Sequence, residues 1–182
     1  NASQDWNVPF LVCNGDIVSD IDLTAFTQSH RTRNAKLSLA LYEVPDPSRY
    51  GVVVLDRNSR VTKFVEKPPP AEAPSNLINA GIWIFESEVT RDMDFKRFNR
   101  VEDELFPNLA KANEAIYGYQ HSGYWADIGT PEAYLQTNLL LLEGAIPELL
   151  PNNWPIDGKA IGTAMLADNV QIKDAVLLGA NT

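Results

Sequence analysis

The chain has 182 residues, of which 45% are apolar and 21% charged, and its formal net charge at pH 7 is -9. This predicts one globular domain of ordinary size with a small appendage. The acidic balance argues against nucleic-acid binding, because phosphate backbones are held by basic surfaces, and no apolar run approaches the ~20 residues needed to cross a bilayer. The single Cys13 excludes an internal disulfide framework and a cysteine-rich zinc site, and we expect a cytoplasmic protein without nucleic-acid or membrane partners.

The first half of the chain alternates apolar runs with one helical pattern. An apolar run over residues 9–13 ends in turn residues, which is typical of a buried parallel strand. Asp22 is a candidate N-cap for a helix over residues 22–32. Strand patterns follow at residues 35–44 and 52–67, the second being two strands joined by a turn at 56–59.

The second half contains the clearest helix of the sequence. Over residues 130–144, Thr130 suits the N-cap, Pro131 the first helical position and Gly144 the end. Before it we expect a strand with an internal glycine at residues 77–85 and a helix that is broken or kinked at its proline at residues 100–113. A strand at residues 115–120 and a loop at residues 121–129 follow.

Strands that alternate with helices favour a layered α/β fold with a mostly parallel sheet. Ligands of such sheets bind beyond the carboxyl ends of the strands. Asp16, the Glu66–Lys67 pair and Asp127 each follow an apolar run. We therefore expect these side chains to line one cleft, although they lie far apart in the sequence.

The composition changes after residue 144. Residues 145–159 are rich in proline and predict a connector. Apolar pairs then recur every six residues, at positions 164/166, 170/172 and 176/178. This period indicates the first coils of a parallel β-helix.

Asp16 and Asp127 each allow two interpretations. Either carboxylate is a ligand for a hard metal such as Mg²⁺, or it caps the segment that follows. Two carboxylates from separate strand ends can hold one Mg²⁺ between them while phosphate oxygens complete the shell. That arrangement neutralises charge during phosphoryl or nucleotidyl transfer.

Glu66 and Lys67 stand side by side where a strand ends and Pro68 begins a stiff loop. Neighbours on a strand point to opposite faces, but the twist at a strand end lets both face a ligand. A glutamate accepts sugar hydroxyls and a lysine neutralises a phosphate, so the pair suits a sugar phosphate. The alternative is an exposed ion pair of little energetic value.

Three further positions remain open on spacing alone. Gly51 and Gly81 either let a ligand approach the backbone or mark a bulge, and Asn79 either bonds a hydroxyl or ties a turn. His30 and His121 have no partner at metal or triad spacing. There is no signature of a serine or cysteine nucleophile.

Six stretches, followed by the six-residue repeats, resemble the sugar-1-phosphate nucleotidyltransferases over nearly the whole chain. In chain order these stretches are FLVCNGD, SRYGVVVLD, FVEKP, NAGIWIF, VEDELFPNLA and GYWADIGTPEAYLQTN. The resemblance implies a Rossmann-like mixed sheet in three α/β/α layers over residues 1–147. It also implies a linker and the start of a left-handed parallel β-helix over residues 148–182. The implied reaction is NTP plus sugar 1-phosphate to nucleotide sugar and pyrophosphate with Mg²⁺, and the likeness favours GTP with mannose 1-phosphate.

The matching motifs also imply roles for particular residues. Asp16 and Asp127 would bind the metal, Glu66 the sugar hydroxyls and Lys67 the sugar phosphate. The sugar phosphate oxygen would attack the α-phosphorus directly, so that Asp16, Lys67 and Asp127 act by positioning and charge neutralisation. The other residues expected to border the substrates are Asn14, Gly15, Tyr50, Gly51, Asn79, Ala80, Gly81 and Trp125.

One departure from the family pattern is the lack of its glycine-rich opening segment. We therefore expect these residues to be the sugar-binding two-thirds of a longer enzyme, homo-oligomeric when complete and inactive as this fragment. The alternatives are a thymidylyl- or uridylyltransferase for glucose 1-phosphate, and an inactive homologue that senses nucleotide sugars. A hexapeptide-repeat acyltransferase would need a histidine within the repeats, and neither His30 nor His121 lies there.

Overall fold

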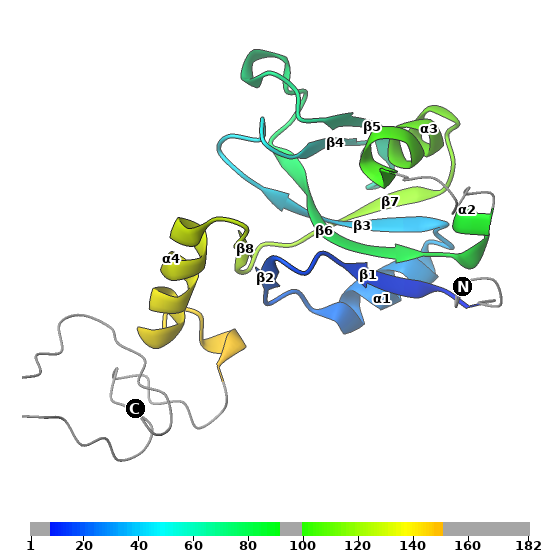
Figure 1. Cartoon of the computed structure of the whole chain (residues 1–182). Helices are drawn as coiled ribbons and strands as arrows, with labels where there is room; N and C mark the ends of the chain where they lie inside the picture. Colours follow the sequence, from blue (N-terminus) through cyan, green and yellow to red (C-terminus); the bar gives the residue numbers. More distant parts are fainter. Residues whose placement is uncertain (1–7, 92–99, 151–182) are drawn as a thin grey trace, which may run out of the picture. The chain divides into compact units, whose positions relative to one another are not determined.

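A computed structural model describes residues 8–91 and 100–150 of the chain. These residues belong to two compact units (Figure 1). Of the described residues, 8–15, 21–91 and 100–123 belong to the first unit, and 16–20 and 124–150 belong to the second.

The first unit is built on a six-stranded mixed sheet (Figure 1). The strand order is β5-β4-β6-β3-β7, and β1 also pairs with β6. The strands are β1 Phe10–Cys13, β3 Leu37–Glu43, β4 Gly51–Leu55, β5 Val61–Glu66, β6 Leu77–Phe85 and β7 Ile116–Gln120. Of the pairings among these strands, only β3 with β7 is parallel. The mixed sheet is confirmed, but the expectation of a mostly parallel sheet was wrong, because β4 and β5 form a tight hairpin and β6 runs against three neighbours.

The strand expected at residues 9–13 is present as β1, but the expectation that it is parallel and buried was wrong. β1 lies antiparallel to β6, and its residues alternate between half-buried and exposed, with Leu11 44% exposed. A continuous apolar run is typical of a strand that is covered on both faces. Among the described strands, β1 pairs with β6 alone.

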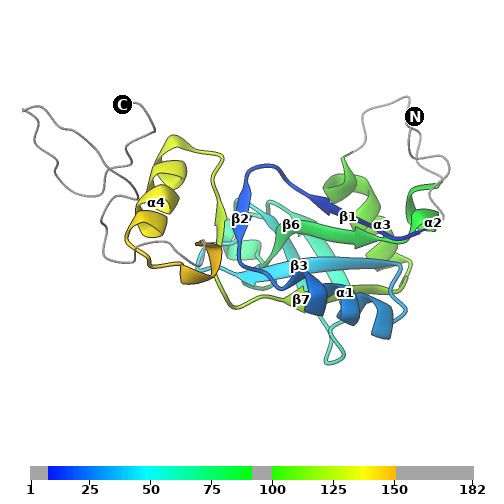
Figure 2. The same cartoon turned by 90° about the horizontal axis from the view of Figure 1, so that it is seen from below.

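Helices cover both faces of this sheet. α1 (Leu23–Thr32) contacts β3 and β7 (Figure 2), and the Phe26 ring lies 5.3 Å from that of Tyr119. α3 (Phe106–Lys111) packs on the other face, where Phe106 meets Trp83 at 5.3 Å. The α1 start is as predicted, because the Asp22 carboxylate accepts from the N–H groups of the helix's second and third residues at 2.9 Å.

The main core lies between the sheet and α3. Its members are apolar and almost fully buried: Leu37, Leu39, Leu41, Val53, Val61, Phe64, Trp83, Phe85, Phe106, Ala110 and Ile116. Four of them are aromatic, and they meet mostly edge to face. β3 is buried on both faces because a helix covers each side of it.

The helix expected over residues 100–113 consists of two pieces. Val101–Leu105 is a π-helical turn in which the Phe106 N–H donates to the Val101 carbonyl, five residues back. α3 then begins at Phe106 with Pro107 in its first turn, where a missing N–H costs nothing. The short helix α2 (Ser87–Arg91) and a 3-10 helix at Pro70–Glu72 complete the unit.

The second unit contains a two-stranded antiparallel ribbon and a helix. The ribbon pairs β2 (Ile17–Ser19) with β8 (Trp125–Asp127), and α4 spans Pro131–Leu142. The loop predicted over 121–129 was therefore wrong at residues 125–127, since a three-residue strand is stabilised by a distant partner. α4 itself is as predicted, with the Thr130 hydroxyl accepting from the third residue at 3.2 Å. A 3-10 helix follows at Pro147–Leu149.

The predicted β-helix and most of its connector lie outside the described residues. No helix in the part of the chain that the structure describes is long and apolar enough to span a bilayer.

Candidate functional site

A carboxylate, a bare glycine and an amide form a row across three strands of the first unit. Glu66, the last residue of β5, pairs with Gly51, the first residue of β4. β4 is joined to β6 through the pair Val52–Ile78, and continuing that register by one residue places Asn79 opposite Gly51. Residues opposite each other on antiparallel strands share a face. The sheet therefore presents Glu66 and Asn79 on one face with a gap between them.

Gly51 leaves the room that this row needs. A Cβ at position 51 would lie 2.4 Å from the Phe64 ring and 2.9 Å from Glu66 Oε2. The Phe64 ring is held in the core, so it cannot retreat without repacking. The glycine thus allows the Glu66 carboxylate to lie over the backbone of β4.

The Glu66 carboxylate is costly to bury. Its side chain is only 15% exposed, and Oε2 has no hydrogen-bond partner among the described residues. Burial raises the pKa of Glu66, the charges of Glu102 and Asp103 raise it further, and Lys67 opposes them. An unpartnered buried acceptor costs about 1–3 kcal/mol. A group kept at such a cost is a candidate for contact with a ligand.

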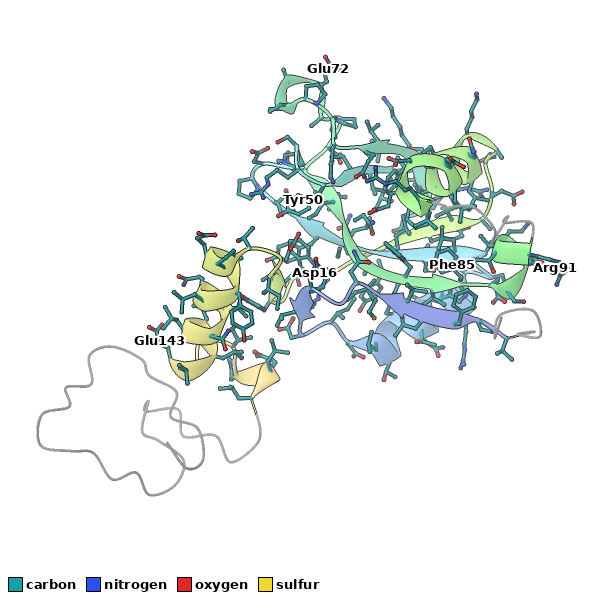
Figure 3. All side chains as sticks on the ribbon, viewed as in Figure 1. Asp16, Tyr50, Glu72, Phe85, Arg91 and Glu143 are labelled. Carbon is teal, nitrogen blue, oxygen red and sulfur yellow. The ribbon has the colours of Figure 1, made fainter. Side chains whose placement is uncertain are left out.

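Lys67 adopts a strained backbone conformation. Its φ is 43°, in the left-handed region, although the next residue is Pro68. The Lys67 N–H donates to the Tyr50 carbonyl at 3.0 Å (Tyr50 is labelled in Figure 3), and Nζ lies 3.6 Å from Glu66 Oε1. The turn therefore brings both charged ends to one side, which an extended strand would not do. Because Lys67 is 58% exposed, the ion pair contributes little to stability.

Asn79 ties a bulge in β6. The register of β3 and β6 shifts at the residues that follow Asn79, and Gly81 there has a φ of 74°. Asn79 Oδ1 accepts from Trp83 Nε1 at 2.6 Å and from the Gly81 N–H at 3.3 Å. Nδ2 donates to Glu102 Oε1 at 2.7 Å. The structure thus supports the turn-tying interpretation, and contact with a hydroxyl stays a prediction.

In the second unit, Asp16 and Asp127 converge on one point. Ile17 pairs with Asp127, and the Asp16 carbonyl accepts from the Ile128 N–H at 2.8 Å. A Cβ on Gly129 would lie 3.0 Å from Asp127 Oδ1 and 3.3 Å from Asp16 Oδ2. Both carboxylates therefore face the space above Gly129, which is open because that residue has no side chain (Asp16 is labelled in Figure 3).

The two aspartates fit a magnesium ion of the kind that works on phosphates. Mg²⁺ is usually held by one or two carboxylates, with waters and substrate oxygens as the remaining ligands. The Gly129 N–H also donates to Asp127 Oδ1 at 2.9 Å, which orients that carboxylate. Within residues 8–91 and 100–150 there is no group of three or more His, Cys, Asp or Glu side chains placed to hold a metal. The site would therefore need oxygens from a substrate or water.

The other expected substrate-binding residues lie in several places. The Asn14 N–H donates to the Gly81 carbonyl at 2.8 Å and extends the pairing of β1 with β6. Gly15 lies in the turn that follows, with open space where a Cβ would be. Ala80 is buried in the β6 bulge, and Trp125 begins β8 in the second unit.

Sequence reasoning missed two residues of these sites. Glu102 is one of three consecutive acidic residues, and nothing in the sequence separates it from its neighbours. Gly129 had a usable signal, since a glycine two positions after Asp127 lets the chain pass close to that carboxylate.

Carboxylates that can hold a divalent cation occur in enzymes that transfer phosphoryl and nucleotidyl groups. Residues 1–144 match the family described as nucleotidyl transferase, and the chain belongs to that family.

Its relatives include mannose-1-phosphate guanylyltransferases. The chain is 38% identical to that of Mycobacterium tuberculosis over 147 residues, covering 80% of this chain and 40% of the relative. It is 37% identical to the mannose-1-phosphate guanyltransferase of Yarrowia lipolytica over 137 residues, covering 75% of this chain and 37% of the relative. The chain thus spans less than half the length of these relatives.

The fold has solved counterparts. HddC from Yersinia pseudotuberculosis superposes with a TM-score of 0.58 at 27% identity, over 72% of this chain and 54% of HddC. HddC has also been solved in complex with GMP-PN, with a TM-score of 0.57. The likeness confirms the mixed α/β nucleotidyltransferase fold.

Proposed function

We propose that the protein transfers a nucleotidyl group from an NTP to a sugar 1-phosphate, and that the pair is GTP and mannose 1-phosphate. The products are GDP-mannose and pyrophosphate. The family match and the names of the two relatives support the reaction class and the substrate pair. Chemistry at two described sites supports the same reaction.

The sugar 1-phosphate is held at the end of β5. Glu66 accepts hydroxyl hydrogens through the oxygen that has no partner in the described structure, and the Lys67 ammonium neutralises the phosphate. The strained turn at Lys67 places both groups on one side, which suits a ligand with hydroxyls and a phosphate on nearby atoms.

Asp16 and Asp127 hold the divalent cation, which we expect to be Mg²⁺. When bound, the cation supplies charge neutralisation at the phosphate oxygens. The two carboxylates fix its position, and the Gly129 N–H orients Asp127. An oxygen of the sugar phosphate attacks the α-phosphorus of the NTP, that P–O bond forms, and the bond to the leaving pyrophosphate breaks.

The single observation that carries the assignment of the sugar site is the buried, unpartnered Oε2 of Glu66 beside the Lys67 ammonium. The experiment is pyrophosphate release by the full-length protein with Mg²⁺. Mannose 1-phosphate and glucose 1-phosphate are each tested with GTP, UTP, dTTP and ATP. We expect turnover with mannose 1-phosphate and GTP to exceed that with every other pair.

Preference for another pair would keep the reaction class and correct the substrate. Absence of turnover with every pair, from a folded protein, would refute the proposal and favour a regulatory homologue. Binding of GDP-mannose without turnover would then identify that homologue as a sensor.

A further inference from the structure

Glu102 contacts a residue of the proposed sugar site from outside the sheet. It belongs to the π-helical turn Val101–Leu105, which leads into α3. Its Oε1 accepts from Asn79 Nδ2 at 2.7 Å. It is also the ionisable neighbour whose charge acts most strongly on the Glu66 carboxylate. One side chain thus acts on two of the groups expected to meet the sugar.

The first action is on the Asn79 amide. Trp83 Nε1 can only donate, so the amide oxygen must face the indole. Glu102 can only accept when ionised, so it holds the amide nitrogen at the other end. The amide is therefore fixed at both ends. One hydrogen on Nδ2 serves Glu102, and no hydrogen bond within the described residues uses the second.

The second action is electrostatic. The charged groups that face Glu66 are Glu102, Asp103 and Lys67. The two acids disfavour the ionised form of Glu66, whereas Lys67 favours it. Removing the charge of Glu102 would therefore make the Glu66 carboxylate easier to ionise.

We propose that Glu102 is a positioning residue of the sugar site, which holds Asn79 as a hydrogen-bond donor opposite the Glu66 acceptor. The ligand that this arrangement recognises is a hydroxyl-bearing ring, whose hydroxyl oxygens accept from Asn79 and whose hydroxyl hydrogens are donated to Glu66. This inference rests on the proposed function, because it names a further residue of the same site.

The backbone around Glu102 supports a functional role. π-helical turns are rare and are frequently found at functional sites. The turn has no side-chain cap, and its wider backbone carries three consecutive acidic residues. Val101 and Leu105 pack against the core and anchor the turn. The Glu102 carboxylate reaches β6, where it accepts the hydrogen bond from Asn79.

Two variants separate the two actions. Glu102→Gln keeps an oxygen that can accept from Asn79 but removes the charge, whereas Glu102→Ala removes both. Glu104→Gln on the same turn is the control, because Glu104 is exposed. All are measured in the full-length protein by steady-state pyrophosphate release between pH 5 and 9.

We expect Glu102→Ala to raise the KM for the sugar 1-phosphate about tenfold while the KM for NTP stays within about twofold. Glu102→Gln should keep the wild-type KM at pH 8. In the pH profile of sugar-phosphate affinity, the acidic limb is the range in which affinity falls as Glu66 is protonated. In Glu102→Gln this limb should move to lower pH. Glu104→Gln should match the wild type in both respects.

A double variant tests whether Glu102 acts through Asn79. If it does, Asn79→Ala with Glu102→Ala should bind the sugar 1-phosphate no more weakly than Asn79→Ala alone at pH 8. A merely structural role predicts additive losses and an equal rise in both KM values. The indole N–H resonance of Trp83, assigned with Trp83→Phe, should shift in Glu102→Ala and stay in place in Glu102→Gln.

The inference is overturned if the KM of Glu102→Ala changes less than threefold, if both KM values rise together, or if the losses add. If Glu102→Ala fails to fold, the acidic limb of Glu102→Gln decides alone, and an unshifted limb overturns the inference. Failure of the proposed function is a separate result, since the wild type would then show no turnover with any substrate pair.

Discussion

Replacing Glu66 by glutamine should weaken sugar binding without weakening the fold. The wild-type carboxylate has a buried oxygen with no partner in the described structure, at a cost of about 1–3 kcal/mol. The Lys67 ammonium at 3.6 Å offsets less than about 1 kcal/mol, because it is mostly exposed. Glutamine keeps an uncharged polar atom at this place but removes the buried charge beside Glu102, so the free energy of unfolding at neutral pH should rise by roughly 1 kcal/mol.

The gain in stability expected for Glu66→Gln depends on pH. The folded-state pKa of Glu66 lies above its ordinary value of 4.5, with burial as the largest cause. Between 4.5 and that raised pKa the folded state binds more protons than the unfolded state, so stability falls as the pH rises through this window. The advantage of Glu66→Gln should therefore be small at pH 4.5 and reach its full value above the raised pKa.

Urea unfolding of both proteins at pH 4.5 and pH 8 measures the stability. Pyrophosphate release measures the loss of sugar-phosphate affinity, expected to be about tenfold or more when one charge-assisted hydrogen bond is lost. Glu72→Gln is the control, because Glu72 is exposed at the end of the 3-10 helix Pro70–Glu72 (Figure 3). A Glu66→Gln protein that is less stable than wild type by 1 kcal/mol at pH 8 would refute the reasoning, since the carboxylate would then stabilise the fold.

Three further outcomes are expected. Asp127→Asn should lower metal-dependent turnover by more than about 100-fold with an unchanged melting temperature, and normal activity would remove Asp127 from the metal site. Replacing Lys67 by glycine or by alanine should raise the KM for sugar phosphate about tenfold in both cases. Only Lys67→Gly should also gain about 1 kcal/mol of stability, because glycine adopts a positive φ without strain, and equal stabilities of the two variants would argue against strain. His30 is 2% exposed and lies 2.8 Å from Ser38 Oγ, and burial lowers its pKa although its bond to Glu86 opposes this. Neutral His30 contributes its full stability above pH 6.5, and this contribution is lost as the pH falls from 6.5 through the lowered pKa, by at most about 1.4 kcal/mol per pH unit. His30→Gln should flatten this dependence of the free energy of unfolding on pH, measured by urea titrations at pH 4–8.

Local signals in the sequence were sufficient for most elements of the fold. Asp22 and Thr130 cap the helices they were expected to cap, because capping depends on bonds between residues two or three positions apart. The hairpin of β4 and β5 was also predicted, since its turn lies between the two strands. The direction of strand pairing and the short ribbon of β2 with β8 were not, because they depend on partners far along the chain.

The candidate sites, like the fold, were predicted only in part from the sequence. The sequence by itself determined the residue types that can work on a sugar phosphate: the Glu66–Lys67 pair and two aspartates, each at the end of an apolar run. Only the tertiary structure decided that Gly51 clears the space beside Glu66 and that Glu102 holds Asn79. The physical reason is that residue identity and local backbone preference are encoded residue by residue. Burial, charge and hydrogen-bond pairing instead arise only when distant segments pack together.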